Sequence, residues 1–197
     1  MLTARLVKML ALLLLLAACG RGEVAEVPKP QEISDGAVGH FCGMGLTEHP
    51  GPKGQIFVGG AKEPVWFASV REVFAFTLLP EEPKNITAIY VTDMGKARNW
   101  QMPEPGTWID ARQAYYVIAS NRHAGMGGDE AVPFGEQPQA QRFVAAHGGR
   151  IVRFAEMPED FVLQGSGASA PDSADQDSAV QDSLGEDHAK DQGKATP

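Results

Sequence analysis

The sequence has little positive charge. It contains 17 lysines and arginines against 25 aspartates and glutamates, which gives a formal net charge of −8 at pH 7. Proteins that bind nucleic acid through its phosphates need a basic surface, so this class of partner is excluded. Common catalytic motifs are also absent: there is no Gly-x-Ser-x-Gly elbow, no His-Glu-x-x-His helix, no phosphate-binding glycine loop and no Cys-x-x-Cys pair. These absences favour a binding protein over an enzyme.

Long apolar runs are missing except for one near the N-terminus. Residues 9–16 are apolar and follow Arg5 and Lys8, and the run is far shorter than the roughly 20 residues that cross a bilayer. The pattern predicts a signal peptide over residues 1–18. Leu16-Ala17-Ala18-Cys19 resembles a bacterial lipobox, so we expect Cys19 to be lipidated on the periplasmic face of a membrane; a chance cysteine beside an ordinary cleavage site is the alternative. Gly20 follows Cys19 at the position where an aspartate would signal retention in the inner membrane, so sorting of the lipoprotein to the outer membrane is favoured.

Cysteine is scarce, with two in the whole chain. If Cys19 carries lipid, Cys42 has no partner within the chain. Cysteines of exported proteins normally pair as disulfides, so a single thiol there needs an explanation. It can pair between molecules, stay buried and inert, or bind a metal.

The neighbours of Cys42 favour the metal. Met44 lies two residues on, and Gly43 and Gly45 allow the backbone to bend both sulfurs toward one point. Thiolate and thioether ligands select Cu(I), whereas zinc sites use cysteine, histidine and carboxylates. Cys42 and Met44 are therefore the first candidate copper ligands.

Composition divides the chain into segments. Residues 19–34 are rich in proline and glutamate and are predicted to form a flexible tether. Residues 164–197 have no aromatic residue and carry seven acids against two lysines, which predicts a disordered acidic tail. One small folded region, residues 35–163, remains between them.

Within the folded region a strand-strand-helix-strand pattern occurs twice, over about residues 53–94 and 105–157. The first unit has predicted strands at 55–58 and 65–68, a helix from Val70 to the residue before Pro80, and a strand at 86–91. The second has a predicted hairpin of strands 107–110 and 115–119, a helix at 138–147 and a strand at 150–154. This order predicts an α+β fold with small antiparallel sheets.

A glycine-rich loop, residues 121–130, interrupts the second unit and contains Met126. A methionine on such a loop has little packing reason, so Met126 is a candidate third soft ligand; a plug over the sheet edge is the alternative. His49 lies in a turn close to Cys42 and His123 lies three residues before Met126. Either histidine is a candidate to complete the site.

Several segments together resemble the NosL family, the accessory lipoproteins of nitrous-oxide reductase. They are Phe41-Cys42-Gly43-Met44, the run from Glu48 to Gln55, Trp66-Phe67-Ala68-Ser69, Tyr90-Val91-Thr92-Asp93, Trp108-Ile109-Asp110-Ala111, Gly125-Met126-Gly127-Gly128 and Val132-Pro133-Phe134.

The resemblance implies a Cu(I)-binding protein of repeated strand-strand-helix-strand units, related in fold to part of organomercurial lyase. It implies delivery of copper to the apoprotein of nitrous-oxide reductase, together with the membrane transporter complex of the same maturation system. The family's sulfur ligands match Cys42, Met44 and Met126. The competing hypothesis is a thiol-dependent lyase or redox protein, which would need a base or a second thiol beside Cys42.

Overall fold

The computed structural model describes residues 26–164. The predicted signal peptide, Cys19 and the acidic tail beyond residue 164 lie outside this range. The elements are η2 (Leu46–Glu48), β1 (Gly54–Val58), β2 (Val65–Phe67), α2 (Val70–Leu78), β3 (Ile86–Thr92), β4 (Trp108–Asp110), β5 (Tyr115–Ile118), β6 (Val132–Phe134), α3 (Gln137–His147), β7 (Arg150–Arg153), η3 (Phe154–Glu156) and α4 (Glu159–Leu163). Among these described elements there is no helix with the length and apolar character needed to cross a membrane.

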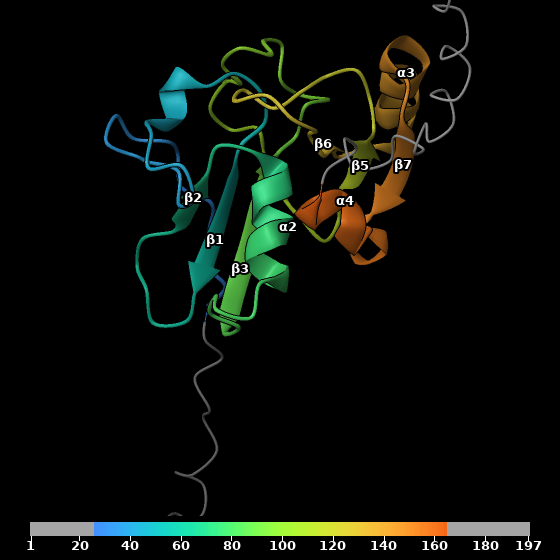
Figure 1. The fold of residues 1–197 in the computed structure, drawn as a ribbon. Coiled ribbons are helices and arrows are strands. Elements are labelled where there is room, and N and C mark those ends of the chain that lie inside the picture. Colours follow the sequence, from blue (N-terminus) through green and yellow to red (C-terminus); the bar gives the residue numbers. More distant parts are fainter. Residues whose placement is uncertain (1–25, 165–197) are drawn as a thin grey trace, which may run out of the picture. The chain divides into compact units, whose positions relative to one another are not determined.

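The first sheet has the order β2-β1-β3-β4, with every neighbouring pair antiparallel, and α2 packs on one of its faces (Figure 1). A capping box starts α2: the Ser69 hydroxyl accepts a hydrogen bond from the Arg71 N–H, and the Glu72 carboxylate accepts one from the Ser69 N–H. The buried face of α2 carries Val70, Val73 and Phe74 into the main core.

The second sheet has the order β6-β5-β7 and is also antiparallel. Helix α3 connects β6 to β7 and packs on this sheet through Ala140 and Phe143. The predicted α+β class with small antiparallel sheets is thus confirmed. The strand-strand-helix-strand order runs β1-β2-α2-β3 in the first unit and β5-β6-α3-β7 in the second, where β6 replaces the predicted strand at residues 107–110.

The predicted hairpin between residues 107–110 and 115–119 is wrong. Trp108–Asp110 forms β4, which pairs with β3 of the first sheet, while the partner of β5 is β6. A turn at Asp110 separates the two strands, because its carbonyl accepts from the Gln113 N–H and its carboxylate from the Arg112 N–H. The chain therefore leaves one sheet at β4 and enters the other at β5.

Part of the predicted flexible tether packs on the first sheet. The Tyr90 hydroxyl donates to the Pro28 carbonyl at 2.7 Å, and Gln31 and Gln55 exchange two hydrogen bonds of 2.8 and 2.9 Å. The prediction of a flexible tether over residues 19–34 therefore needs correction for residues 28–32.

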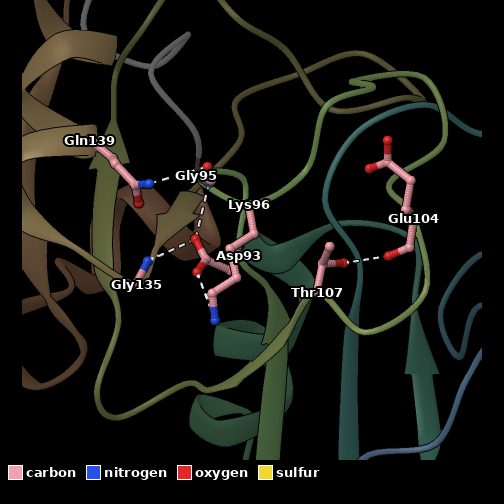
Figure 2. A network of polar contacts seen from close by, with 7 residues as sticks. All are labelled: Asp93, Gly95, Lys96, Glu104, Thr107, Gly135 and Gln139. Atoms are coloured by element: carbon pink, nitrogen blue, oxygen red, sulfur yellow. Dashed lines mark hydrogen bonds and ion pairs between the residues drawn. The ribbon is translucent and has the colours of Figure 1, made fainter.

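A buried carboxylate joins the two sheets (Figure 2). Asp93 follows β3, is 1% exposed, and accepts hydrogen bonds from the N–H groups of Gly95 and Gly135 at 3.0 and 2.9 Å. The Lys96 ammonium lies 3.7 Å from its other oxygen. Since Gly135 follows β6, Asp93 fixes the end of β3 to the start of the segment that leads into α3.

Candidate metal centre

Cys42 and Met44 lie on a tight loop before η2. An isolated antiparallel bridge between Val38 and Gly45 closes it, and the Gly39 N–H donates to the Met44 carbonyl at 2.9 Å. Gly43 takes a positive φ of 66° at the bend, a conformation that residues with a side chain rarely adopt. The predicted glycine-dependent bend is therefore present, and both sulfur residues belong to one short loop.

The thiol of Cys42 is free and half-buried. It packs against a small apolar cluster of Ala37, Leu46 and Ala68, while its Sγ lies 4.0 Å from the Gly39 carbonyl oxygen. Met44 differs, since 41% of it is exposed. The loop thus presents one half-buried and one exposed sulfur residue.

The loop of residues 121–130 closes on itself and presents Met126. The Ala124 N–H donates to the Gly128 carbonyl at 3.1 Å, and the Gly127 N–H donates to the Ala124 carbonyl at 2.8 Å. Met126 is 41% exposed, as Met44 is. A side chain with this exposure contributes little to packing.

This loop touches the turn that contains His49. A Cβ atom at Gly125 would lie 2.5 Å from the Pro50 carbonyl oxygen and 2.8 Å from the His49 Cβ, so only glycine fits there. The Nε2 atom of His49 is buried and has no hydrogen-bond partner among the described residues. His123 instead places its Nδ1 3.2 Å from the Gly128 carbonyl oxygen. Of the two histidines, His49 has the unpaired nitrogen beside the Met126 loop.

Trp100 contacts both the turn that contains His49 and the loop that contains Met126. Its carbonyl accepts the Gly51 N–H at 2.9 Å, and its ring lies against Gly51. The Arg122 guanidinium, at the start of the Met126 loop, lies 4.2 Å from the centre of the same ring. One aromatic side chain therefore supports both the His49 turn and the Met126 loop.

The 3₁₀ helix η2 connects the two pairs of candidate ligands. Cys42 and Met44 precede it, and His49 follows it at the contact with Gly125. At a rise of roughly 2 Å per residue, a three-residue 3₁₀ helix spans about 6 Å. In Figure 1, η2 lies at the same end of the first sheet as the yellow loop before β6. Cys42 and Met44 thus lie on the loop before η2, and His49 and Met126 lie on the two segments that meet at Gly125.

Glu130 ties the end of the Met126 loop to helix α2. It is 1% exposed, and its Oε1 accepts hydrogen bonds of 2.9 to 3.1 Å from the Ser69 hydroxyl and from the N–H groups of Val70, Arg71 and Ala131. The Oε2 atom has no partner within residues 26–164. Burial raises the pKa of Glu130 to about 7, against the lowering effect of these hydrogen bonds.

Comparison with known proteins identifies the family. The family model described as NosL matches residues 30–162. The chain belongs to the NosL family. The resemblance seen in the sequence segments is thereby confirmed.

Named relatives of the NosL family span most of the chain. The copper-binding lipoprotein NosL of Achromobacter cycloclastes is 44% identical over 160 residues, which are 81% of this chain and 82% of the relative. That of Stutzerimonas stutzeri is 37% identical over 155 residues, 77% and 79% of the two chains. The crystal structure of the copper chaperone NosL from Shewanella denitrificans superposes with a TM-score of 0.63 at 33% identity, covering 66% of this chain and 96% of that one.

Two buried charged residues of this NosL-family chain escaped the sequence analysis. Glu130 ends the loop of residues 121–130 and Lys53 lies in the run from Glu48 to Gln55, but no sequence pattern marks either residue as a buried charge. Burial lowers the pKa of Lys53 to about 8, while the charges of Glu130 and Glu72 act in the opposite direction. Their burial depends on contacts far along the chain, so no local sequence signal marks them.

Proposed function

We propose that this chain is a lipid-anchored carrier that binds one Cu(I) ion and delivers it for the maturation of nitrous-oxide reductase. The observation that carries the proposal is the free Cys42 thiol on a glycine-bent loop that also exposes Met44. Two soft ligands on one loop favour a soft, monovalent ion. The names of the relatives, a copper-binding lipoprotein and a copper chaperone, support the same cargo.

The proposed ligands are Cys42, Met44 and Met126, with the His49 nitrogen as the candidate to complete or replace one of them. Metal binding displaces the thiol proton, so Cys42 binds as thiolate. The two methionines are each 41% exposed, which leaves them open to a partner's ligands. Copper can then pass to an acceptor one ligand at a time.

The proposed location at a membrane supports the proposed delivery of copper. A lipid on Cys19 would hold the carrier at the periplasmic face of a membrane, with the outer membrane favoured. Confinement raises the effective concentration near a membrane-bound donor. The proposed partners are the membrane transporter complex of the same maturation system and the reductase apoprotein, with copper passing to the latter.

A thiol-dependent lyase is the weaker alternative. It needs a base beside the thiol, and His40 is the nearest histidine in sequence. Its Nε2 lies 2.9 Å from a carboxylate oxygen of Glu82. The Cys42 Sγ has the Gly39 carbonyl oxygen as its partner, at 4.0 Å, and among the described residues it forms no hydrogen bond with a histidine. We therefore propose binding without catalysis.

The direct test is anaerobic titration of the purified protein with Cu(I) in the presence of a competing chelator. We expect one ion per chain, and a loss of at least tenfold in affinity in Cys42→Ser. Transfer to copper-free reductase is then measured as recovery of reductase activity. Unchanged stoichiometry and affinity in Cys42→Ser would overturn the proposed site, and failure of transfer alone would overturn only the delivery step.

A further inference from the structure

One cavity of the described structure has none of the proposed copper ligands in its lining. Its volume is about 160 Å³, and its apolar lining consists of Ile33, Leu46, Met102, Pro103, Pro105 and Trp108. Thr92 also lines it, on the face of β3 opposite Val91, which packs in the main core. The cavity therefore lies on the face of the first sheet away from that core. At roughly 30 Å³ per molecule of liquid water, it has the volume of about five waters.

Lys53 brings a buried positive charge to this cavity. The residue is 3% exposed and lines the cavity, and its ammonium donates to the Gly51 carbonyl at 2.8 Å. An ammonium has three N–H donors, so one acceptor leaves two without a partner. Within residues 26–164, Lys53 forms no ion pair. Burial lowers its pKa to about 8, while the nearby charges of Glu130 and Glu72 act in the opposite direction.

The acidic residues of the lining already have donors of their own. The carboxylate of Glu32 accepts from the Gly106 N–H at 2.9 Å and from the Trp108 indole N–H at 3.3 Å. The carboxylate of Glu104 accepts from the Arg98 N–H at 3.0 Å and pairs with its Nε at 3.4 Å. Lys53 is thus the one cation among the residues that line this cavity, and like Glu32 it forms no ion pair within residues 26–164.

We propose that this cavity binds a small aliphatic monocarboxylate of about four carbons. Its carboxylate pairs with the Lys53 ammonium through a charge-assisted hydrogen bond, and its hydrocarbon chain lies against the apolar lining. A ligand of this size fits a cavity of about 160 Å³. A neutral ligand of the same shape would form no charge-assisted hydrogen bond with the lysine and would bind more weakly.

The test uses the purified protein labelled with ¹⁵N and titrated with n-butyrate at pH 7. The Trp108 indole N–H and the amides of Thr92 and Thr107 report on the cavity in two-dimensional NMR spectra. We expect a saturable shift of these signals at millimolar butyrate, and at least tenfold weaker binding of n-butyramide, the neutral analogue. Equal shifts with both compounds, or no saturable shift at these residues, would overturn the proposal.

Two lysine variants separate the buried charge from general attraction to anions. Lys53→Met keeps an apolar stem of similar length and should weaken butyrate binding at least tenfold. Lys62→Met, at an exposed lysine outside the lining, should bind as the parent does. The butyramide comparison is made on the parent protein and stands even if Lys53→Met fails to fold. Parent-like binding by a folded Lys53→Met would assign the cavity to apolar packing alone.

Discussion

At the scale of single residues, the exposed methionines are the feature that packing does not explain. Met44 and Met126 are each 41% exposed, although burying a methionine side chain is worth roughly 1.5–3 kcal/mol. Each lies on a loop that is closed by its own backbone hydrogen bonds, so neither is needed to hold its loop in shape. The proposed role as a metal ligand would account for both positions.

We expect Met126→Leu to lower Cu(I) affinity about tenfold or more while changing the free energy of unfolding by less than about 0.5 kcal/mol, since the side chain is exposed. Chelator competition and chemical denaturation measure the two quantities. Met102→Leu is the matched control, because Met102 is 46% exposed but lines the cavity that contains Lys53 and is not a proposed copper ligand. Equal copper affinity in both variants would remove Met126 from the ligand set.

At the scale of elements, the glycine contact between the Met126 loop and the His49 turn is the joint of the proposed site. We expect Gly125→Ala to destabilise the fold by about 1–3 kcal/mol, because the added Cβ would lie 2.5 Å from the Pro50 carbonyl oxygen. Copper affinity should fall as well, since the loop is forced away from His49.

Gly36→Ala is the control for this change, as a Cβ at Gly36 would meet no atom within 4 Å. It should leave both thermal stability and copper affinity at the parent values. Parent-like copper affinity in a measurably destabilised Gly125→Ala would show that the contact serves the fold and not the site.

The anchor of the Met126 loop on α2 should make stability depend on pH. Burial raises the pKa of Glu130 from 4.5 to about 7, so the folded state holds this proton more tightly than the unfolded state. Its contribution is therefore fully present below about pH 4.5 and is lost as the pH rises through about 7. The loss is on the order of 3 kcal/mol.

Glu130→Gln should remove this dependence, because the amide oxygen keeps the acceptor role of Oε1 and carries no charge. Urea unfolding between pH 4.5 and 7.5 measures it, below the range in which Lys53, with its pKa lowered to about 8, adds a slope of opposite sign. If Glu130→Gln loses stability with rising pH as steeply as the parent, the slope has another origin.

Local elements were predictable from the sequence, whereas their partners were not. The capping box at Ser69 and the high content of β-branched residues in β3 are signals within a few residues. The pairing of β4 with β3 depends on contacts between residues near 90 and 109. The burial of Glu130 was unpredictable for the same reason, because its hydrogen-bond donors at Ser69, Val70 and Arg71 lie about sixty positions away in the sequence.

The candidate site was likewise predictable only in part from the sequence. Cys42 and Met44 are two residues apart, so their shared loop follows from sequence spacing. The choice between His49 and His123 required the fold, because the unpaired Nε2 of His49 and its contact with Gly125 join residues far apart in the chain.

At the scale of the whole molecule, copper should clamp the two units together. The proposed ligands Cys42 and Met44 precede the first sheet, and Met126 lies between the strands of the second. A ligand that binds only the folded state at 100 times its dissociation constant stabilises it by about 2.7 kcal/mol. We expect a rise in melting temperature of roughly 5–10 °C on loading.

Hydrogen exchange locates this effect. Copper should slow exchange across residues 121–130 in the parent and much less in Met126→Leu. Equal protection of that loop in the two loaded proteins would show that copper does not join the two units through Met126.

The central claim is a sulfur-rich copper site, and X-ray absorption at the copper K edge of the Cu(I)-loaded protein tests it most directly. We expect an absorption edge typical of Cu(I), with two or three sulfur atoms in the first coordination shell of copper in the parent protein. One sulfur fewer should remain in Met126→Leu, and any nitrogen scatterer should disappear in His49→Phe. A first shell of nitrogen and oxygen alone, or one that Cys42→Ser leaves unchanged, would contradict the account.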